Sequence, residues 1–292
     1  TVIDEQHKFG VKQRHKLQKK SSDSHILVLS ATPIPRSLTF VIYGEIDVSF
    51  IKSKPQDRKP VNTTIIGQSK IKKIVDGVER VIKNNEKVFW VLPRIGDEKN
   101  DENDENKSSV LKRYNYLKNR FAEKVAYVHG RMDKTDIEKI FYEFNENKIM
   151  ILVTTTLIEV GIDITKATTI IIEEANKFGL AQLHQLRGRV GRNNFNANCV
   201  LIHTNNISEN GKARLNVMKE SNDGFYISEQ DLKIRGGGEV FGIRQTGLPA
   251  WKFFQAHKDL KIIEDVKKNA NILESKQKLT LSLLKLFFNN KK

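Results

Sequence analysis

Residues 150–172 read MILVTTTLIEVGIDITKATTIII, which is two apolar runs with a more polar segment between them. The runs Met150–Thr154 and Thr169–Ile172 are short and rich in β-branched side chains, as β-strands are. The consecutive isoleucines that end the second run indicate a strand covered on both faces, which is typical of parallel sheets.

Runs of the same kind alternate with helical patterns over the first two thirds of the chain. This alternation predicts βα units and therefore an α/β fold built on parallel sheets. We expect strands at Thr1–Ile3, Ile26–Leu29, Val61–Ile66, Val88–Leu92, Val125–Val128, Met150–Thr154, Thr169–Ile172 and Val200–His203. We expect helices at 11–20, 35–43, 69–84, 109–122, 133–146 and 179–190, with two more at 208–221 and 225–234 and a helical tail from 251 onward.

Breaks in these patterns divide the chain into four parts. Pro55 and Pro60 mark a linker, and the pattern becomes wholly helical after Thr204. We therefore expect domains at 1–52, 53–206, 207–250 and 251–292. The acidic, Asn-rich run at 97–105 has no apolar residue and indicates a surface insertion without chemistry. Because a buried strand already begins at Thr1, we expect the chain to be the C-terminal part of a longer protein.

The composition bounds the partners and the compartment. The 292 residues carry a formal net charge of +15, which favours a polyanion such as nucleic acid. Lys, Asn and Ile are abundant together, so an AT-rich genome is an alternative source of part of this excess. The single cysteine, Cys199, lies in an apolar run and indicates a core residue in a reducing compartment. No apolar segment approaches the roughly 18 residues of a membrane span, so we expect a cytoplasmic protein without a membrane-spanning part.

A basic segment at 182–192 carries the strongest chemical signal. If it is helical, Gln185, Arg189 and Arg192 fall at i, i+4 and i+7 and project from one face. Two guanidiniums and an amide placed together suit a triphosphate, and an arginine against a transferring phosphoryl group is worth roughly 10³–10⁵ in rate. The alternative is a solvated basic helix.

Two glycines within the same segment argue against that alternative. Gly188 and Gly191 would each cost about 1 kcal/mol inside a helix. Their presence suggests that something must approach the backbone closely. On such a helix Arg187 would point away from the other two arginines.

An acidic cluster and two hydroxyls follow the first two predicted strands. Asp4-Glu5-Gln6-His7 comes directly after a strand, and ligands of open α/β sheets bind beyond the carboxyl ends of strands. One carboxylate could hold Mg²⁺ while the other orients or deprotonates water. Ser30 and Thr32 could hydrogen-bond this cluster. The alternatives are an acidic surface turn and a turn favoured by the following Pro33.

Three further segments suit phosphate oxygens. His129-Gly130-Arg131 closes one strand and Thr154-Thr155-Thr156 closes the next, with Gly161 and Asp163 shortly after. Hydroxyls, backbone N–H groups and helix N-termini at such positions suit phosphate oxygens, and such contacts give no sequence preference. The alternatives are a β-branched strand end and a loop cap.

These segments together resemble the superfamily 2 helicases. Residues 4–7, 30–32, 160–163 and 185–192 occur in the order of helicase motifs II, III, V and VI. The chain is most similar to the RecG family of bacterial branch-migration helicases. That resemblance rests on 4–11, 31–36, 179–186, 222–225 and 231–236.

The resemblance implies a role for each matching residue. Asp4 would hold Mg²⁺ and Glu5 would act on water, while Arg189 and Arg192 would reach the γ-phosphate of ATP from the second lobe. Arg131 and Thr155 would contact the DNA backbone. Coupling between nucleotide and DNA is implied for Gln6, His7, Ser30, Thr32, Gly161 and Asp163.

The segment from 208 to 247 is similar to a helical hairpin that turns lobe closure into movement along duplex DNA. Its candidate translocation residues are Arg214, Arg235, Arg244 and Gln245. The alternative is a hairpin that only packs on the second lobe. Position 237 is Gly where the family usually has Pro, so this loop would be more mobile.

The resemblance implies tandem RecA-like lobes, with the first truncated, a helical hairpin and a helical tail. We expect a monomeric part of an ATP- and Mg²⁺-dependent helicase that remodels stalled forks and Holliday junctions, with branched or duplex DNA as its partner. No Gly-x-x-x-x-Gly-Lys-Ser/Thr phosphate loop occurs in the sequence, so we expect this polypeptide to be inactive alone. The alternatives are a transcription-repair coupling translocase and a non-catalytic DNA-binding module; an RNA helicase fits poorly.

Overall fold

The computed structural model describes residues 1–4, 25, 27–30, 49–51, 59–93, 105–130, 132–155, 167–191, 195–235, 265 and 269. The predicted helices at 11–20 and 35–43 lie outside the described residues. So do nearly all of the acidic run at 97–105 and, except for two helical residues, the tail from 251 onward.

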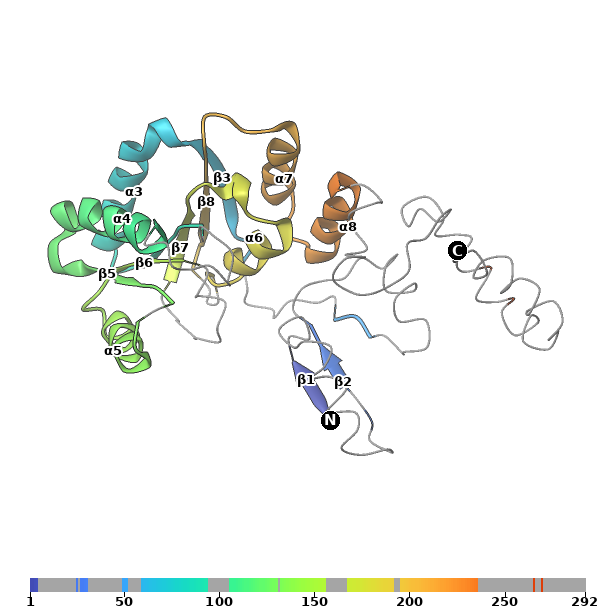
Figure 1. Ribbon diagram of the computed structural model, residues 1–292, viewed down its shortest axis with the longest axis horizontal. Coiled ribbons are helices and arrows are strands. Elements are labelled where there is room, and N and C mark those ends of the chain that lie inside the picture. Colours follow the sequence, from blue (N-terminus) through green and yellow to red (C-terminus); the bar gives the residue numbers. More distant parts are fainter. Residues whose placement is uncertain are drawn as a thin grey trace, which may run out of the picture. The chain divides into compact units, whose positions relative to one another are not determined.

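A six-stranded sheet forms the centre of the structure from Val61 to His203, and every neighbouring pair in it is parallel. The strand order is β3-β8-β7-β4-β6-β5 (Figure 1). The strands are β3 (Asn62–Gly67), β4 (Lys87–Val91), β5 (Val125–Val128), β6 (Ile151–Thr154), β7 (Ala167–Ile172) and β8 (Asn198–His203). The parallel α/β fold and its strands are therefore confirmed, with ends that differ from the prediction by at most two residues.

The two central strands, β7 and β4, are buried on both faces. Every residue of each is buried, and alternate side chains enter different cores. Phe89 and Val91 face one core, whereas Val88 and Trp90 face the other. The run of isoleucines in β7 is explained in the same way, because Ile171 faces away from its two neighbours.

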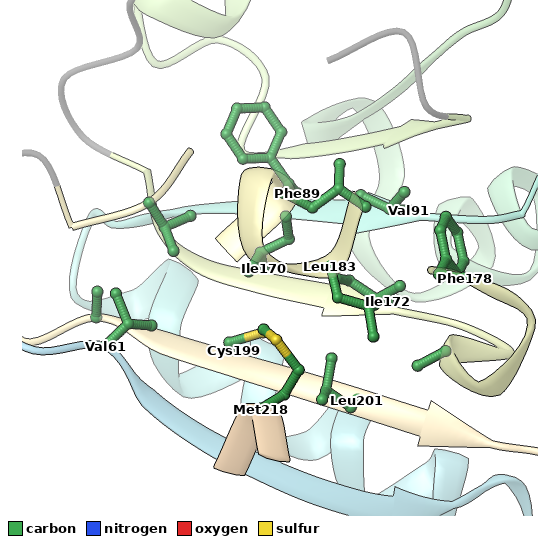
Figure 2. Packing of buried hydrophobic residues seen from close by; sticks show 14 of the residues in the cluster. Val61, Phe89, Val91, Ile170, Ile172, Phe178, Leu183, Cys199, Leu201 and Met218 are labelled. Carbon is green, nitrogen blue, oxygen red and sulfur yellow. The ribbon is translucent and has the colours of Figure 1, made fainter. Parts of the chain in front are cut away.

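Helices cover both faces of this sheet. One core contains α3 (Ile71–Lys83) and α4 (Glu105–Phe121). The other contains α5 (Lys134–Asn145), α6 (Leu180–Arg187), α7 (Glu209–Glu220) and α8 (Gly224–Arg235). Figure 2 shows this second core, where Cys199 and Leu201 of β8 lie beside Met218 of α7. Short 3-10 helices occur at η2 (Gln68–Lys70), η3 (Ala122–Lys124) and η5 (Ala175–Lys177).

Side-chain caps begin helices α7 and α8. The Ser208 hydroxyl accepts a hydrogen bond from the Gly211 amide at 3.1 Å, at the start of α7. The Asp223 carboxylate accepts one from the Phe225 amide at 2.9 Å, at the start of α8. Such caps satisfy amides that have no partner inside the helix. The helices predicted at 208–221 and 225–234 are confirmed.

A separate pair of parallel strands, β1 (Val2–Asp4) and β2 (Leu27–Leu29), precedes the large sheet in the chain. Asp4 lies opposite Leu29 in the register. Val2, Leu27 and Leu29 are exposed although they are apolar. The domain boundaries at 52, 206 and 250 stay predictions. In the part of the chain that the structure describes, no helix has the length and apolarity needed to cross a membrane.

Candidate functional site

The basic segment begins as a helix but does not continue as one. In α6, Leu180, Leu183 and Leu186 are buried against the sheet, and the side-chain oxygen of Gln182 accepts a hydrogen bond from the Gly179 amide at 3.2 Å. The helix ends at Arg187, whereas the sequence predicts a helix over 179–190. The expected i, i+4, i+7 face of Gln185, Arg189 and Arg192 is therefore wrong as a helical feature.

The chain turns at Gly191, four residues after the end of α6. Gly191 has a φ of +68°, in the left-handed region that glycine tolerates best. A Cβ at this position would lie 2.8 Å from the Cβ of Ala197 and 3.5 Å from Val61. The close approach that the glycine suggested is therefore made by the protein itself, where the segment turns to re-enter the sheet.

The turn after α6 lies at the amino-terminal edge of the sheet. The Gly191 amide donates a hydrogen bond of 3.4 Å to the carbonyl of Ala167, the first residue of β7. Arg189, within this turn, is partly exposed, as is Gln185 on α6. Arg192 lies outside the described residues.

Arg187 has a different environment from its neighbours. It is 2% exposed, and its Nη1 donates hydrogen bonds to the carbonyls of Met218 at 2.7 Å and Ser221 at 2.8 Å. The same nitrogen lies 3.4 Å from the Thr63 hydroxyl, and Nη2 lies 3.2 Å from the Nδ1 of His184. Burial lowers the pKa of Arg187 from its ordinary value. These contacts hold Arg187 inside the lobe, whereas Arg189 is partly exposed.

The opposite, carboxyl-terminal edge of the sheet carries Thr155, one of the two residues predicted to contact DNA. Thr155 directly follows β6 and is buried, and the Thr154 hydroxyl donates to the Thr155 carbonyl at 3.0 Å. His129 follows the neighbouring strand β5, and its ring stacks on Tyr127 with centroids 5.9 Å apart. Arg131, Gly161 and Asp163 lie outside the described residues.

The small parallel pair brings together two other predicted residues. Because Asp4 ends β1 and Ser30 directly follows β2, both lie at the same edge of this pair. Asp4 is exposed. Glu5, Gln6, His7 and Thr32 lie outside the described residues. Among those that are described, no three His, Cys, Asp or Glu side chains form a metal-binding group.

One translocation candidate is held against the lobe. The Arg214 side chain on α7 donates from Nη1 to the Phe178 carbonyl at 3.2 Å and from Nε to the Asn210 carbonyl at 3.3 Å. This contact ties α7 to the loop before α6. Arg235 ends α8, but its side chain lies outside the described part, as do Arg244 and Gln245.

Sequence reasoning missed a buried acid at the carboxyl-terminal edge. Glu173 directly follows β7 and accepts hydrogen bonds from the Trp90 indole at 2.5 Å and from Arg113 Nε and Nη2 at 2.5 and 2.9 Å. The Arg113 guanidinium also lies over the Trp90 ring at 5.4 Å. The available signal was an acidic residue directly after the three isoleucines that end β7.

Comparisons with known proteins agree with this architecture. Residues 72–194 match the family model of the helicase conserved C-terminal domain. The chain is 41% identical over 276 residues to the ATP-dependent DNA helicase RecG of Streptococcus pneumoniae, covering 94% of this chain and 40% of that relative. It is 39% identical over 271 residues to that of Bacillus subtilis, covering 92% and 39%.

A solved structure of RecG bound to a three-way DNA junction also matches, with 37% identity and a TM-score of 0.66. The match covers 90% of this chain and 33% of that chain. The fold and these matches define an α/β helicase structure with a RecA-like lobe. Within that class, the chain is similar to RecG helicases over about nine tenths of its length. It spans about two fifths of the length of the curated relatives that it matches.

Proposed function

We propose that this chain is the part of an ATP-dependent double-stranded DNA translocase that carries the second RecA-like lobe and the helical hairpin. The whole protein would remodel branched DNA, such as stalled forks and Holliday junctions, during recombination and repair in the cytoplasm, as a monomer. The observation that carries this proposal is the match over nine tenths of the chain to a RecG structure that holds a DNA junction.

The nucleotide side of the proposal uses two groups of residues, the acidic residues at the end of β1 and the basic segment at 182–192. Asp4 would bind Mg²⁺, and an exposed carboxylate at a strand end fits an ion that takes one or two carboxylates and keeps several waters. Glu5 would orient the attacking water. Gln185, Arg189 and Arg192 would contact the phosphates from the second lobe. ATP would supply the free energy for movement.

The DNA side of the proposal uses the other edge of the large sheet. Arg131 and Thr155 would contact the sugar–phosphate backbone, so the grip would not depend on sequence. Coupling between the two sides is proposed for Gln6, His7, Ser30, Thr32, Gly161 and Asp163. Translocation is proposed for Arg214, Arg235, Arg244 and Gln245.

The geometry of the lobe supports this division of labour. The turn with Arg189 lies at the amino-terminal edge, whereas Thr155 lies at the carboxyl-terminal edge. Strands of four to six residues separate the two edges, which is about 13–20 Å. A sheet that is buried on both faces is stiff, so it can carry a displacement from one edge to the other.

Binding of this chain to a three-way DNA junction tests the proposal. We expect the affinity to fall steeply with salt, by about 0.9 log units per log unit of salt for each phosphate neutralised. Arg131→Gln should make this slope shallower by about 1. Arg120→Gln removes the same charge from α4, where Arg120 pairs with Asp76 and Glu79, and should leave the slope unchanged. An affinity that does not depend on salt would exclude a DNA-backbone grip.

A further inference from the structure

Arg187 is a buried cation whose hydrogen-bond partners are all uncharged. They are two backbone carbonyls, a threonine hydroxyl and an imidazole nitrogen. Burying a guanidinium without a carboxylate is costly unless its donors are well satisfied. The hydrogen-bond partners of Arg187 therefore identify the parts of the fold that this side chain connects.

The two carbonyls lie at one place in the fold, the end of α7. Met218 belongs to the last turn of α7, whose carbonyls have no partner inside the helix, and Ser221 is its C-cap. This end of a helix also carries partial negative charge. Nη1 of Arg187 therefore contacts the carbonyl end of a helix where a carboxylate would be the usual partner. This contact holds the corner that leads from α7 to α8.

The backbone of Arg187 is hydrogen-bonded within the turn that carries Arg189. The Arg187 carbonyl accepts from the Val190 amide at 3.4 Å, and the Arg189 amide donates to the Leu186 carbonyl at 3.0 Å. Arg189 thus follows Arg187 by two residues in a turn closed by short-range hydrogen bonds. One residue is attached to the turn through its backbone and to the helical corner through its side chain.

We propose that Arg187 is a positioning residue that makes the turn 188–191 and the α7–α8 corner, residues 221–223, move as one unit. This inference rests on the proposed function, in which the turn senses the nucleotide and the hairpin moves on DNA. Arg187 contacts neither ligand. It sets where Arg189 stands relative to the hairpin.

A role in fold stability alone makes a different prediction. Loss of a merely stabilising contact loosens the whole lobe, including the centre of the sheet. Loss of a positioning contact loosens the turn and the corner together and leaves the centre of the sheet unchanged, because local openings have their own free energies.

Hydrogen exchange of the 292-residue chain without ligands separates the two roles. Amides that report on the turn are hydrogen-bonded in Gly188, Arg189, Val190 and Gly191. Those that report on the corner are hydrogen-bonded in Ser221, Asp223, Phe225 and Ile227. In Arg187→Met we expect both groups to exchange at least about ten-fold faster, with the β7 amides changed by less than about three-fold.

Matched variants make each outcome decisive. Arg187→Lys keeps the charge but replaces the two nitrogens that face the carbonyls and the His184 ring with one, so it should restore slow exchange only in part. Burial of Cys199 reports that the lobe has folded. If Arg187→Met does not keep this thiol buried, Arg187→Lys takes its place in the test. Arg120→Met removes an arginine that contacts α3, and it should leave both groups of amides unchanged.

Two results would overturn the inference: exchange at the turn and corner that stays within about two-fold of the original chain, or exchange that rises equally in β7. Neither result depends on DNA or nucleotide. A chain that fails to bind the three-way junction would therefore contradict the proposed function without deciding the role of Arg187.

Discussion

At single residues, the sequence can predict that a close contact exists without identifying the partner in that contact. Gly188 and Gly191 suggest a close approach to the backbone, and the approach exists at Gly191. Its source is Ala197 and Val61 of the same lobe, which no property of residues 182–192 could reveal. The contact partner of a glycine is set by the path of the chain.

Substitution of Gly191 tests this explanation. We expect Gly191→Ala to lower the free energy of unfolding by roughly 1–3 kcal/mol, because an alanine would have to adopt a positive φ and would meet Ala197. Gly77→Ala is the matched control, since a Cβ there has only the flexible Arg80 side chain nearby at 3.9 Å. In the interior of α3 it should raise the free energy by about 0.5–1 kcal/mol. Urea unfolding measures both, and equal effects would contradict the explanation.

The thiol of Cys199 gives a pH dependence with a defined sign. Burial raises the pKa of Cys199 to about 12, whereas an unfolded cysteine titrates near about 8.5. The folded state therefore binds the proton more tightly, so its stabilising effect is complete below about pH 8.5 and is lost as pH rises toward 12. The unfolding free energy should fall by up to about 1.4 kcal/mol per pH unit above pH 9.

Two measurements check this prediction. Urea unfolding at pH 8 to 10 should show the decrease in the original chain, and the difference from Cys199→Ala removes the contribution of other titrating groups. Thiol-specific reagents at pH 8 should label Cys199 only in urea. Rapid labelling of the native chain would show that the side chain is accessible, against its position in Figure 2.

Elements of secondary structure follow the sequence closely where their pattern is strong. Strands β3 to β8 lie within two residues of their predicted bounds because their apolar runs are bounded by polar turns. Helix α4 begins four residues earlier than predicted, at Glu105, within a polar segment that has no helical periodicity. Helix α6 ends three residues earlier than predicted, and residues 188–190 form a turn that is closed by short-range hydrogen bonds.

Contacts between elements should differ greatly in strength. Glu173 joins β7 to β4 and α4 through buried hydrogen bonds from Trp90 and Arg113. Arg120 joins α4 to α3 on the surface, through Asp76 and Glu79 at 2.7 Å each. The pKa of Glu79 is lowered by its hydrogen bonds to Arg120 and Lys83, but water and salt screen such exposed pairs.

We expect Glu173→Gln to lower the free energy of unfolding by about 3 kcal/mol, because it leaves the Arg113 cation nearly buried without its counter-charge. Arg120→Met should cost at most about 1 kcal/mol. Urea unfolding at 0.1 and 1 M NaCl distinguishes the two, since only the Arg120 effect should shrink with salt. A Glu173 effect that disappears at high salt would contradict a buried pair.

At the scale of the whole molecule, ATP turnover requires groups that this sequence does not contain. We expect this 292-residue polypeptide to show no appreciable ATP turnover, with or without junction DNA, because its sequence has no phosphate loop to supply the lysine and backbone amides for the β- and γ-phosphates. Steady-state phosphate release measures this. Turnover that is abolished by Glu5→Gln would contradict the expectation.

The amino-acid sequence by itself determined the alternation of strands and helices, the parallel sheet, the order of the helicase motifs and, through them, the resemblance to RecG helicases. These features depend on periodicity and spacing over a few residues, which a linear pattern contains. The tertiary structure alone decided that Arg187 is buried while Arg189 lies in a partly exposed turn, and that Glu173 holds a buried arginine. The groups that make these differences are remote in the chain: Met218 and Ser221 are 31 and 34 residues from Arg187, and Thr63 is 124 residues away. The fate of a charged side chain depends on which carbonyls and hydroxyls the fold places beside it, and only the folded chain brings those groups together.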